Sequence, residues 1–253
     1  MSGSLLSLVR DLRRRRGRER RHLAVAEGVR LVEEAIASGV PIRGAAVSPA
    51  LEGTTRGAAL KAELERRGVP IEPVSVPELD ELADTEHPQG VVAVIEPRQW
   101  TLADVPAGVV LALDAVQDPG NVGTMLRTAL GLGAAGVVAL KGTADLTNAK
   151  VLRGSMGAAF RLPAPAASEA DLVEWARARG SEIWVAAADG EAVHRGTRAR
   201  DVVLVVGNEG AGVGAVLSNA AARRVAIPLR PGAESLNVAV AAGILLYEVL
   251  RDH

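Results

Sequence analysis

Cysteine is absent from the 253 residues of this chain, and histidine is scarce. Without cysteine the chain can form no disulfide, thiolate metal site or cysteine nucleophile. The chain has four histidines, His22, His87, His194 and His253. They do not have the spacing of zinc ligands. We therefore expect no metal.

Long apolar runs are also missing. No uncharged apolar stretch reaches the roughly 18 residues that span a bilayer. The short apolar patch near the N-terminus is followed directly by arginines, which is unlike a secretory signal. We therefore expect a cytoplasmic protein without a membrane partner.

Aromatic residues are rare. Lysine is also rare, so the positive charge of the chain is carried almost entirely by arginine guanidinium groups. Residues 13–21 read RRRRGRERR, although the net charge of the chain is only −1. Arginine pairs bidentately with phosphate, which favours a salt-sensitive RNA-binding patch. The alternative interpretation is a solvated helix face or a frayed tail. The candidate RNA-binding residues are Arg13, Arg14, Arg15, Arg16, Arg18, Arg20 and Arg21.

The chain divides into two α/β parts. Prolines and lost periodicity mark residues 98–107 as a linker between domains at 1–97 and 108–253. In the second part, apolar strands alternate with helices, which predicts a parallel sheet covered by helices. The predicted strands are 109–113, 136–140, 183–187, 202–206 and 224–227, and the predicted helices are 122–132, 146–160, 169–179, 213–222 and 236–251.

Three loops follow strands of this predicted sheet, where ligands of parallel sheets bind. After residue 113, Pro119-Gly120 predicts a turn and Asn121 is expected to cap the next helix. Arg127 then interrupts an otherwise apolar helix. It is either functional or an arginine whose charged end reaches the surface.

The other two loops are rich in glycine and proline. Gly207-Asn208-Glu209-Gly210-x-Gly212 follows the fourth strand, and its glycines allow a backbone to approach a ligand closely. Ile227-Pro228-Leu229 follows the fifth strand, and Ser235-Leu236-Asn237-Val238 opens the last helix, with Ser235 as the expected cap.

These three loops resemble, in order and spacing, the three motifs of the SpoU (TrmH) RNA ribose 2′-O-methyltransferases of the SPOUT superfamily. The first motif is Asn121-x-Gly123-x-x-x-Arg127. Residues 153–158 and 160–163 resemble the segment that the family has between its first two motifs. Residues 26–30 and 88–90 resemble the small N-terminal substrate-binding domain of many members.

The resemblance implies a parallel α/β fold with a C-terminal trefoil knot, S-adenosylmethionine as cofactor, and a homodimer with composite active sites. It implies that Gly207, Ile227 and Leu236 line the cofactor pocket. It further implies that the reaction centre contains Asn121, Arg127, Glu209, Ser235 and Asn237.

The separate N-terminal domain resembles the ribosomal-RNA members of the family more than the compact transfer-RNA members, and this resemblance implies ribosomal RNA, with the large subunit favoured, as substrate. Alternatives are transfer RNA 2′-O-methylation and a non-catalytic RNA-binding protein of the same fold. A nucleotide-binding oxidoreductase is a further alternative, but its G-x-G-x-x-G fingerprint is misplaced. Residues 131–136 match it, yet they follow a helix and lead into a strand.

Overall fold

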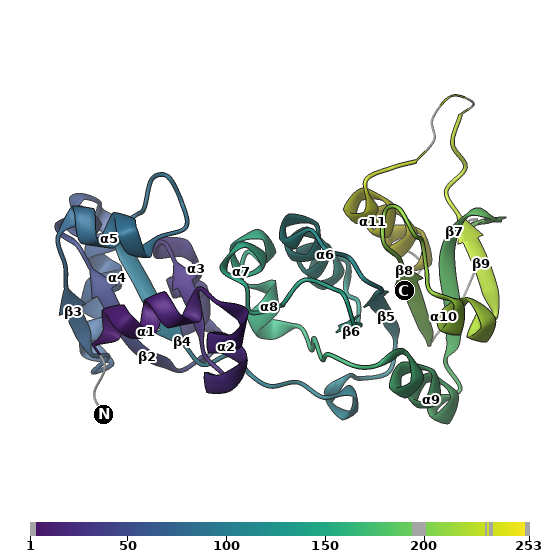
Figure 1. The fold of residues 1–253 in the computed structure, drawn as a ribbon, viewed down its shortest axis with the longest axis horizontal. Coiled ribbons are helices and arrows are strands. Elements are labelled where there is room, and N and C mark those ends of the chain that lie inside the picture. The colour runs from purple at the N-terminus through teal and green to yellow at the C-terminus, as the bar shows by residue number, and fades with distance from the viewer. Residues whose placement is uncertain (1–3, 194–200, 231, 233–234, 251–253) are drawn as a thin grey trace. The chain divides into compact units, whose positions relative to one another are not determined.

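The computed structural model describes residues 4–193, 201–230, 232 and 235–250. The chain forms two compact units (Figure 1). Unit 1 comprises residues 1–98 and 147–161, and unit 2 comprises residues 99–146 and 162–253. Within the described ranges, no helix is long and apolar enough to cross a membrane.

Unit 1 is built on a four-stranded sheet with the order β1-β4-β2-β3. Strand β4 is antiparallel to β1 and β2, whereas β3 is parallel to β2. Ser75 caps α5 through a capping box with Glu78, and Thr54 caps α4. The elements are α1 (Leu5–Leu12), α2 (Arg15–Arg21), β1 (Ala24–Glu27), α3 (Val29–Ala37), β2 (Ile42–Val47), η1 (Pro49–Gly53), α4 (Thr55–Arg66), β3 (Ile71–Pro73), α5 (Val76–Leu82) and β4 (Val91–Ile95).

The second segment of unit 1 comes from the middle of the chain. Residues 147–161 form α7 (Ala149–Ser155) and α8 (Ala158–Arg161), and they place Leu152 and Phe160 in the core of the N-terminal sheet. The prediction of one continuous helix over 146–160 was wrong. Met156 and Gly157 both adopt positive φ, at 50° and 84°, and this left-handed pair ends α7.

Unit 2 contains the predicted parallel sheet, which is confirmed. Its order is β6-β5-β8-β7-β9, and every pairing is parallel. The strands are β5 (Val109–Leu113), β6 (Gly136–Ala139), β7 (Glu182–Ala192), β8 (Val202–Val206) and β9 (Arg223–Ala226). Strand β7 extends beyond the predicted 183–187, because its pairing with β9 resumes after an irregularity between Ala186 and Glu191.

The helices of unit 2 flank this sheet (Figure 1). Helix α9 matches its prediction, since Ser168 caps its start and Gly180 ends it in the left-handed conformation. The elements are η2 (Leu102–Asp104), α6 (Pro119–Leu132), α9 (Glu169–Arg179), α10 (Ala215–Ala220) and α11 (Val238–Leu250). Leu172, Val203 and Leu217 are fully buried in the core between α9, α10 and the sheet.

Candidate functional site

The sheet of unit 2 has a topological switch point at β5. From this strand the chain proceeds to β6 on one side, whereas β8 pairs on the other side. Leu113 and Val206, the last residues of β5 and β8, are register partners. The loops that follow these two strands therefore start side by side, in the position where parallel α/β sheets bind ligands.

In the first loop, Asp118 caps α6, and the predicted capping role of Asn121 was wrong. The carboxylate of Asp118 accepts a hydrogen bond of 2.8 Å from the backbone N–H of Asn121. The helix begins at Pro119, so Asn121 lies inside its first turn. Because the cap is provided by Asp118, the amide side chain of Asn121 is available for other partners.

The second loop is a tight turn organised by Asn208. Its side-chain oxygen accepts from the backbone N–H of Gly210 (2.9 Å) and Ala211 (3.2 Å). Its backbone exchanges two hydrogen bonds with Gly212. A Cβ at Gly207 would lie 2.2 Å from the carbonyl oxygen of Gly212, so only glycine fits at position 207 without moving the loop.

In the third loop, Asn237 rather than Ser235 caps the last helix. The Oδ1 of Asn237 accepts from the backbone N–H groups of Ala239 (2.9 Å) and Val240 (3.3 Å). Helix α11 therefore begins at Val238, and the predicted cap at Ser235 was wrong. Ser235 is exposed and makes no hydrogen bond within the described residues.

A chain of side-chain hydrogen bonds joins the three loops. The Nδ2 of Asn121 donates to Oε1 of Glu209 at 2.7 Å. The Nδ2 of Asn237 donates to Oδ1 of Asn121 at 3.0 Å. The structure thus brings together three of the five residues predicted for the reaction centre, although they are separated by 88 and 116 positions in the sequence.

Arg127 is exposed on α6. Its guanidinium makes no hydrogen bond or ion pair within the part of the chain that the structure describes, so it is not neutralised by Glu209 or by any other described carboxylate. An exposed arginine with all its donors available is suited to bind an anion or to stabilise a developing negative charge.

The residues predicted to line a cofactor pocket follow β8 and β9. Gly207 is held against Gly212, Ile227 is half-buried directly after β9, and Leu236 is 36% exposed. Strand β7 separates β8 from β9 in the sheet. No hydrogen bond joins the backbones of Gly207, Ile227 and Leu236 within the described residues.

Two positioning residues were missed by the sequence analysis. Asp114 is 5% exposed, and its carboxylate accepts from the backbone N–H of Gly214 at 2.7 Å. Asn208 donates from Nδ2 to the carbonyl of Ala115 at 3.1 Å. Both bonds tie the second loop to the end of β5. The signals were a carboxylate directly after an apolar strand and an amide within a glycine loop.

In the arginine block, three residues bind groups at the end of α1 or just after it, namely Arg18, Arg20 and Arg21. Arg18 is only 6% exposed and donates to the carbonyls of Leu12 and Arg13, both at 2.9 Å. Arg20 and Arg21 each bind the carboxylate of Asp11 at 2.8 Å. Hydrogen bonds from Arg21 and Arg20 hold the pKa of Asp11 below its usual value. These contacts fold α2 against α1.

The remaining arginines of the block are more available. Arg13 pairs with Asp84 at 3.0 Å, and Arg15 pairs with Glu19 at 2.7 Å on the exposed surface. Arg14 and Arg16 are exposed and make no hydrogen bond through their side chains within the described ranges. These two guanidiniums are therefore the best candidates for contacts with phosphate.

Comparison with known proteins identifies the class. The profile of the SpoU rRNA Methylase family matches residues 108–247, and the profile of the MRM3-like substrate binding domain matches residues 7–93. The 23S rRNA (guanosine(2553)-2'-O)-methyltransferase RlmP of Bacillus subtilis is 36% identical over 241 residues, covering 95% of this chain and 93% of the relative.

Solved structures agree over the whole chain. The SpoU methyltransferase AviRb from Streptomyces viridochromogenes, in complex with AdoMet, has a TM-score of 0.86 at 28% identity and covers 99% of this chain and 98% of that one. An AdoMet-bound rRNA methyltransferase from Sinorhizobium meliloti has a TM-score of 0.85 at 31% identity, covering 99% and 97%.

The second unit is a parallel α/β fold in which hydrogen bonds join the three loops at the switch point of the sheet. The chain belongs to the SpoU rRNA Methylase family. The resemblance inferred from the three motifs is therefore confirmed.

The close approach at Gly207 can be tested with a pair of glycine substitutions. Gly207→Ala should lower the free energy of unfolding by about 1–3 kcal/mol, because the new Cβ overlaps the backbone of Gly212. Gly131→Ala is the matched control. Gly131 lies within α6 with no atom near the added Cβ, so this change should raise stability by about 0.5–1 kcal/mol. Urea unfolding measures both, and equal effects would contradict the packing of the second loop.

Proposed function

We propose that this protein is an S-adenosylmethionine-dependent RNA 2′-O-ribose methyltransferase that acts on ribosomal RNA of the large subunit. The observation that carries the proposal is the hydrogen-bond chain Glu209–Asn121–Asn237 at the switch point. Its members come from the three motifs of the family. The relatives named as 23S rRNA methyltransferases support ribosomal RNA as the substrate class.

The residues of the second and third loops fit the proposed cofactor. Leu229 and Leu236 expose apolar side chains, at 39% and 36%, which can cover an adenine ring. Gly207 and Gly212 pack backbone against backbone, so neither carries a side chain at this part of the loop. We assign Gly207, Ile227 and Leu236 to the cofactor pocket. When bound, S-adenosylmethionine supplies an electrophilic methyl group on a sulfonium.

The side chains of the reaction centre have distinct roles in the proposed transfer. The 2′-oxygen of the ribose forms the new bond to the methyl carbon, while the bond from that carbon to sulfur breaks. Glu209 accepts the proton of the hydroxyl at Oε2, because its Oε1 is occupied by Asn121. Asn237 in turn orients Asn121. Alignment of the reacting groups provides a large share of the rate increase.

Arg127 stabilises the negative charge that develops on the 2′-oxygen. A guanidinium does not deprotonate in proteins, so it acts by electrostatic preorganisation and not as the base. We assign Ser235, two residues before Asn237, to the same centre as a hydroxyl that contacts the substrate. Its exposure leaves the hydroxyl accessible.

Removing the guanidinium should separate chemistry from cofactor binding. Arg127→Ala should lower kcat for methyl transfer by about 10²–10³-fold, the usual cost of losing one donor to a developing oxyanion. The Kd of S-adenosylhomocysteine, measured by calorimetry, should stay within about twofold of wild type. Arg66→Ala is the control, since Arg66 is an exposed arginine of unit 1. Retained turnover in Arg127→Ala would remove this residue from the chemistry.

The arginine block supplies part of the contact with RNA. The double variant Arg14→Gln/Arg16→Gln should weaken RNA binding and reduce the dependence of log Kd on log salt by about 1.4 to 1.8, the value for two lost phosphate contacts. The control Arg66→Gln/Arg67→Gln removes two arginines that both pair with Glu63. An unchanged salt slope in the first variant would assign Arg14 and Arg16 to a solvated helix face.

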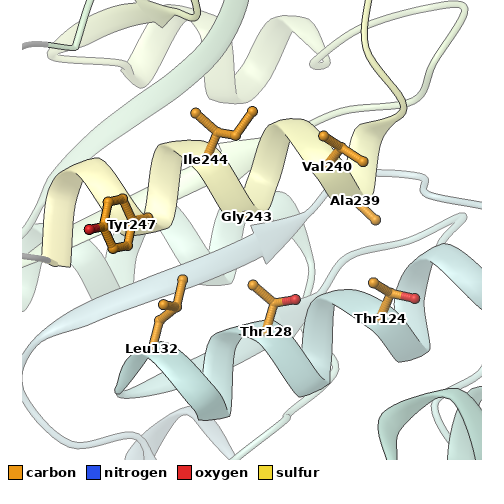
Figure 2. A pocket seen from close by; sticks show the side chains of 8 residues that line it. All are labelled: Thr124, Thr128, Leu132, Ala239, Val240, Gly243, Ile244 and Tyr247. Atoms are coloured by element: carbon orange, nitrogen blue, oxygen red, sulfur yellow. The ribbon is translucent and has the colours of Figure 1, made fainter.

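An apolar groove between α6 and α11 supports a homodimer. It has a volume of about 480 Å³, and Figure 2 shows Thr124, Thr128 and Leu132 of α6 pointing toward α11. Val240 and Tyr247 of α11 are 51% and 52% exposed. Helix α11 carries a single charged residue, Glu248, and helices that are apolar on nearly all sides are normally buried. A second copy of the chain is the proposed cover.

A charge placed in this groove should disrupt the dimer. Ile244→Glu should shift the sedimentation coefficient from dimer to monomer, because Ile244 lies in the groove and is 39% exposed. The matched control is Val76→Glu, which places the same charge at an exposed apolar position of α5, with 43% exposure. A wild-type protein that sediments as a monomer would overturn the dimer.

Three further statements stay predictions. The domain division at residues 98–107, the trefoil knot in the C-terminal part and the cytoplasmic location all follow from the resemblance or from composition. The family membership supports the knot.

A further inference from the structure

Residues 147–161 lie within the sequence matched by the methylase profile, but they pack in unit 1. Leu152 is 1% exposed and Phe160 is 7% exposed, and both belong to the core around the N-terminal sheet. Arg161 adds an ion pair with Glu34 of α3 at 2.9 Å. A segment of the methylase sequence therefore completes the substrate-binding domain.

A buried carboxylate anchors this segment. Glu27 is 5% exposed and accepts hydrogen bonds from the backbone N–H groups of Asp84 (2.9 Å) and Thr85 (3.1 Å). It also accepts from the hydroxyl of Thr85 and from Nη1 of Arg153 at 3.0 Å. A buried charge with this many partners is fixed in place, so Arg153 is held by Glu27 as a positioning residue.

A pocket of about 170 Å³ lies beside this ion pair. It is lined by two arginines, two carboxylates, a glutamine, a glycine and two apolar side chains, namely Arg30, Arg153, Glu27, Glu34, Gln89, Gly28, Leu31 and Met156. The pocket is smaller than the roughly 300–1,000 Å³ of pockets for drug-sized ligands. It is too small for a whole coenzyme, but it suits one planar base.

Hydrogen-bonding groups at the pocket remain available. The guanidinium of Arg30 is exposed and makes no hydrogen bond or ion pair among the described residues. The Oε1 of Gln89 accepts a hydrogen bond from the backbone N–H of Val29 at 3.0 Å. The Nε2 of Gln89 has no hydrogen-bond partner among the residues that the structure describes. Two available donor groups therefore lie beside the apolar side chains of Leu31 and Met156. The two carboxylates of the pocket, Glu27 and Glu34, are paired with Arg153 and Arg161.

We propose that this pocket of unit 1 binds one unpaired nucleotide of the RNA substrate. The base lies against Leu31 and Met156 and accepts a hydrogen bond from Nε2 of Gln89, while Arg30 contacts a neighbouring phosphate. Proteins read RNA sequence mainly through such unstacked bases. This inference rests on the proposed function, because it assumes that RNA is the substrate, and it adds a specific recognition site outside the reaction centre.

Two single substitutions test the pocket without disturbing its framework. Arg30→Gln removes the exposed guanidinium. Gln89→Glu replaces only the Nε2 donor and keeps an oxygen for the backbone N–H of Val29. Arg66→Gln is the control, since all three changes alter the net charge by the same amount and Arg66 lies on α4, outside the pocket.

The probe is a protein-free transcript of large-subunit ribosomal RNA, with Kd measured by filter binding and methyl transfer measured separately. Arg30→Gln and Gln89→Glu should each raise the Kd and the KM for RNA about tenfold, the size of one hydrogen bond, with kcat within about twofold of wild type. Arg30→Gln should also lower the salt slope by about one, the value for one lost phosphate contact.

The proposal is overturned if the Kd of both variants equals that of Arg66→Gln, or if kcat falls while KM is unchanged. The binding measurement also separates this inference from the proposed function. A wild-type protein that binds the transcript but transfers no methyl group would refute the methyltransferase assignment and leave the pocket to be judged by the Kd values alone.

Discussion

The site depends on one amide side chain, that of Asn121, which bonds in two directions. It donates to Glu209 and accepts from Asn237, and so it connects segments that follow β5, β8 and β9. This is possible because Asp118 caps α6 and Asn237 caps α11 with its own oxygen. Asn121 therefore bonds to the second loop through its Nδ2 and to the third loop through its Oδ1. Asn237 caps α11 with its Oδ1 and bonds to Asn121 through its Nδ2.

The backbone of the second loop, which carries Glu209, is tightly constrained. Asn208 and Asp114 fasten the second loop to the end of β5, and Gly207 allows the closest approach. Buried hydrogen bonds to a carboxylate are costly to break, so the loop presents Glu209 in a defined position. A preorganised site of this kind stabilises charge without rearranging during the reaction.

The sequence predicted the parallel sheet and the three loops because continuous apolar strands and glycine or proline turns are local signals. It did not predict the caps. Asp118 and Asn121 are both good cap residues, as are Ser235 and Asn237, and only the folded backbone decides between them. Likewise, periodicity cannot reveal that Met156 takes a left-handed conformation and divides the helix predicted over 146–160.

The arginine block illustrates the same limit. Seven similar side chains have different environments, since Arg18 is buried against carbonyls while Arg14 and Arg16 are exposed. Composition predicts the charge of a segment, but long-range contacts decide which charges remain available. The association of residues 147–161 with the N-terminal sheet is also a long-range packing outcome, carried by Leu152 and Phe160.

The most direct test of the account is the chemical form of the transferred methyl group. The purified protein would be incubated with ribosomal RNA and S-adenosylmethionine labelled in the methyl group, and the RNA then hydrolysed in alkali. The account predicts label in alkali-resistant dinucleotides, because a 2′-O-methyl group prevents cleavage of the adjacent phosphodiester. Label in single nucleotides, which indicates base methylation, or no incorporation at all would contradict it.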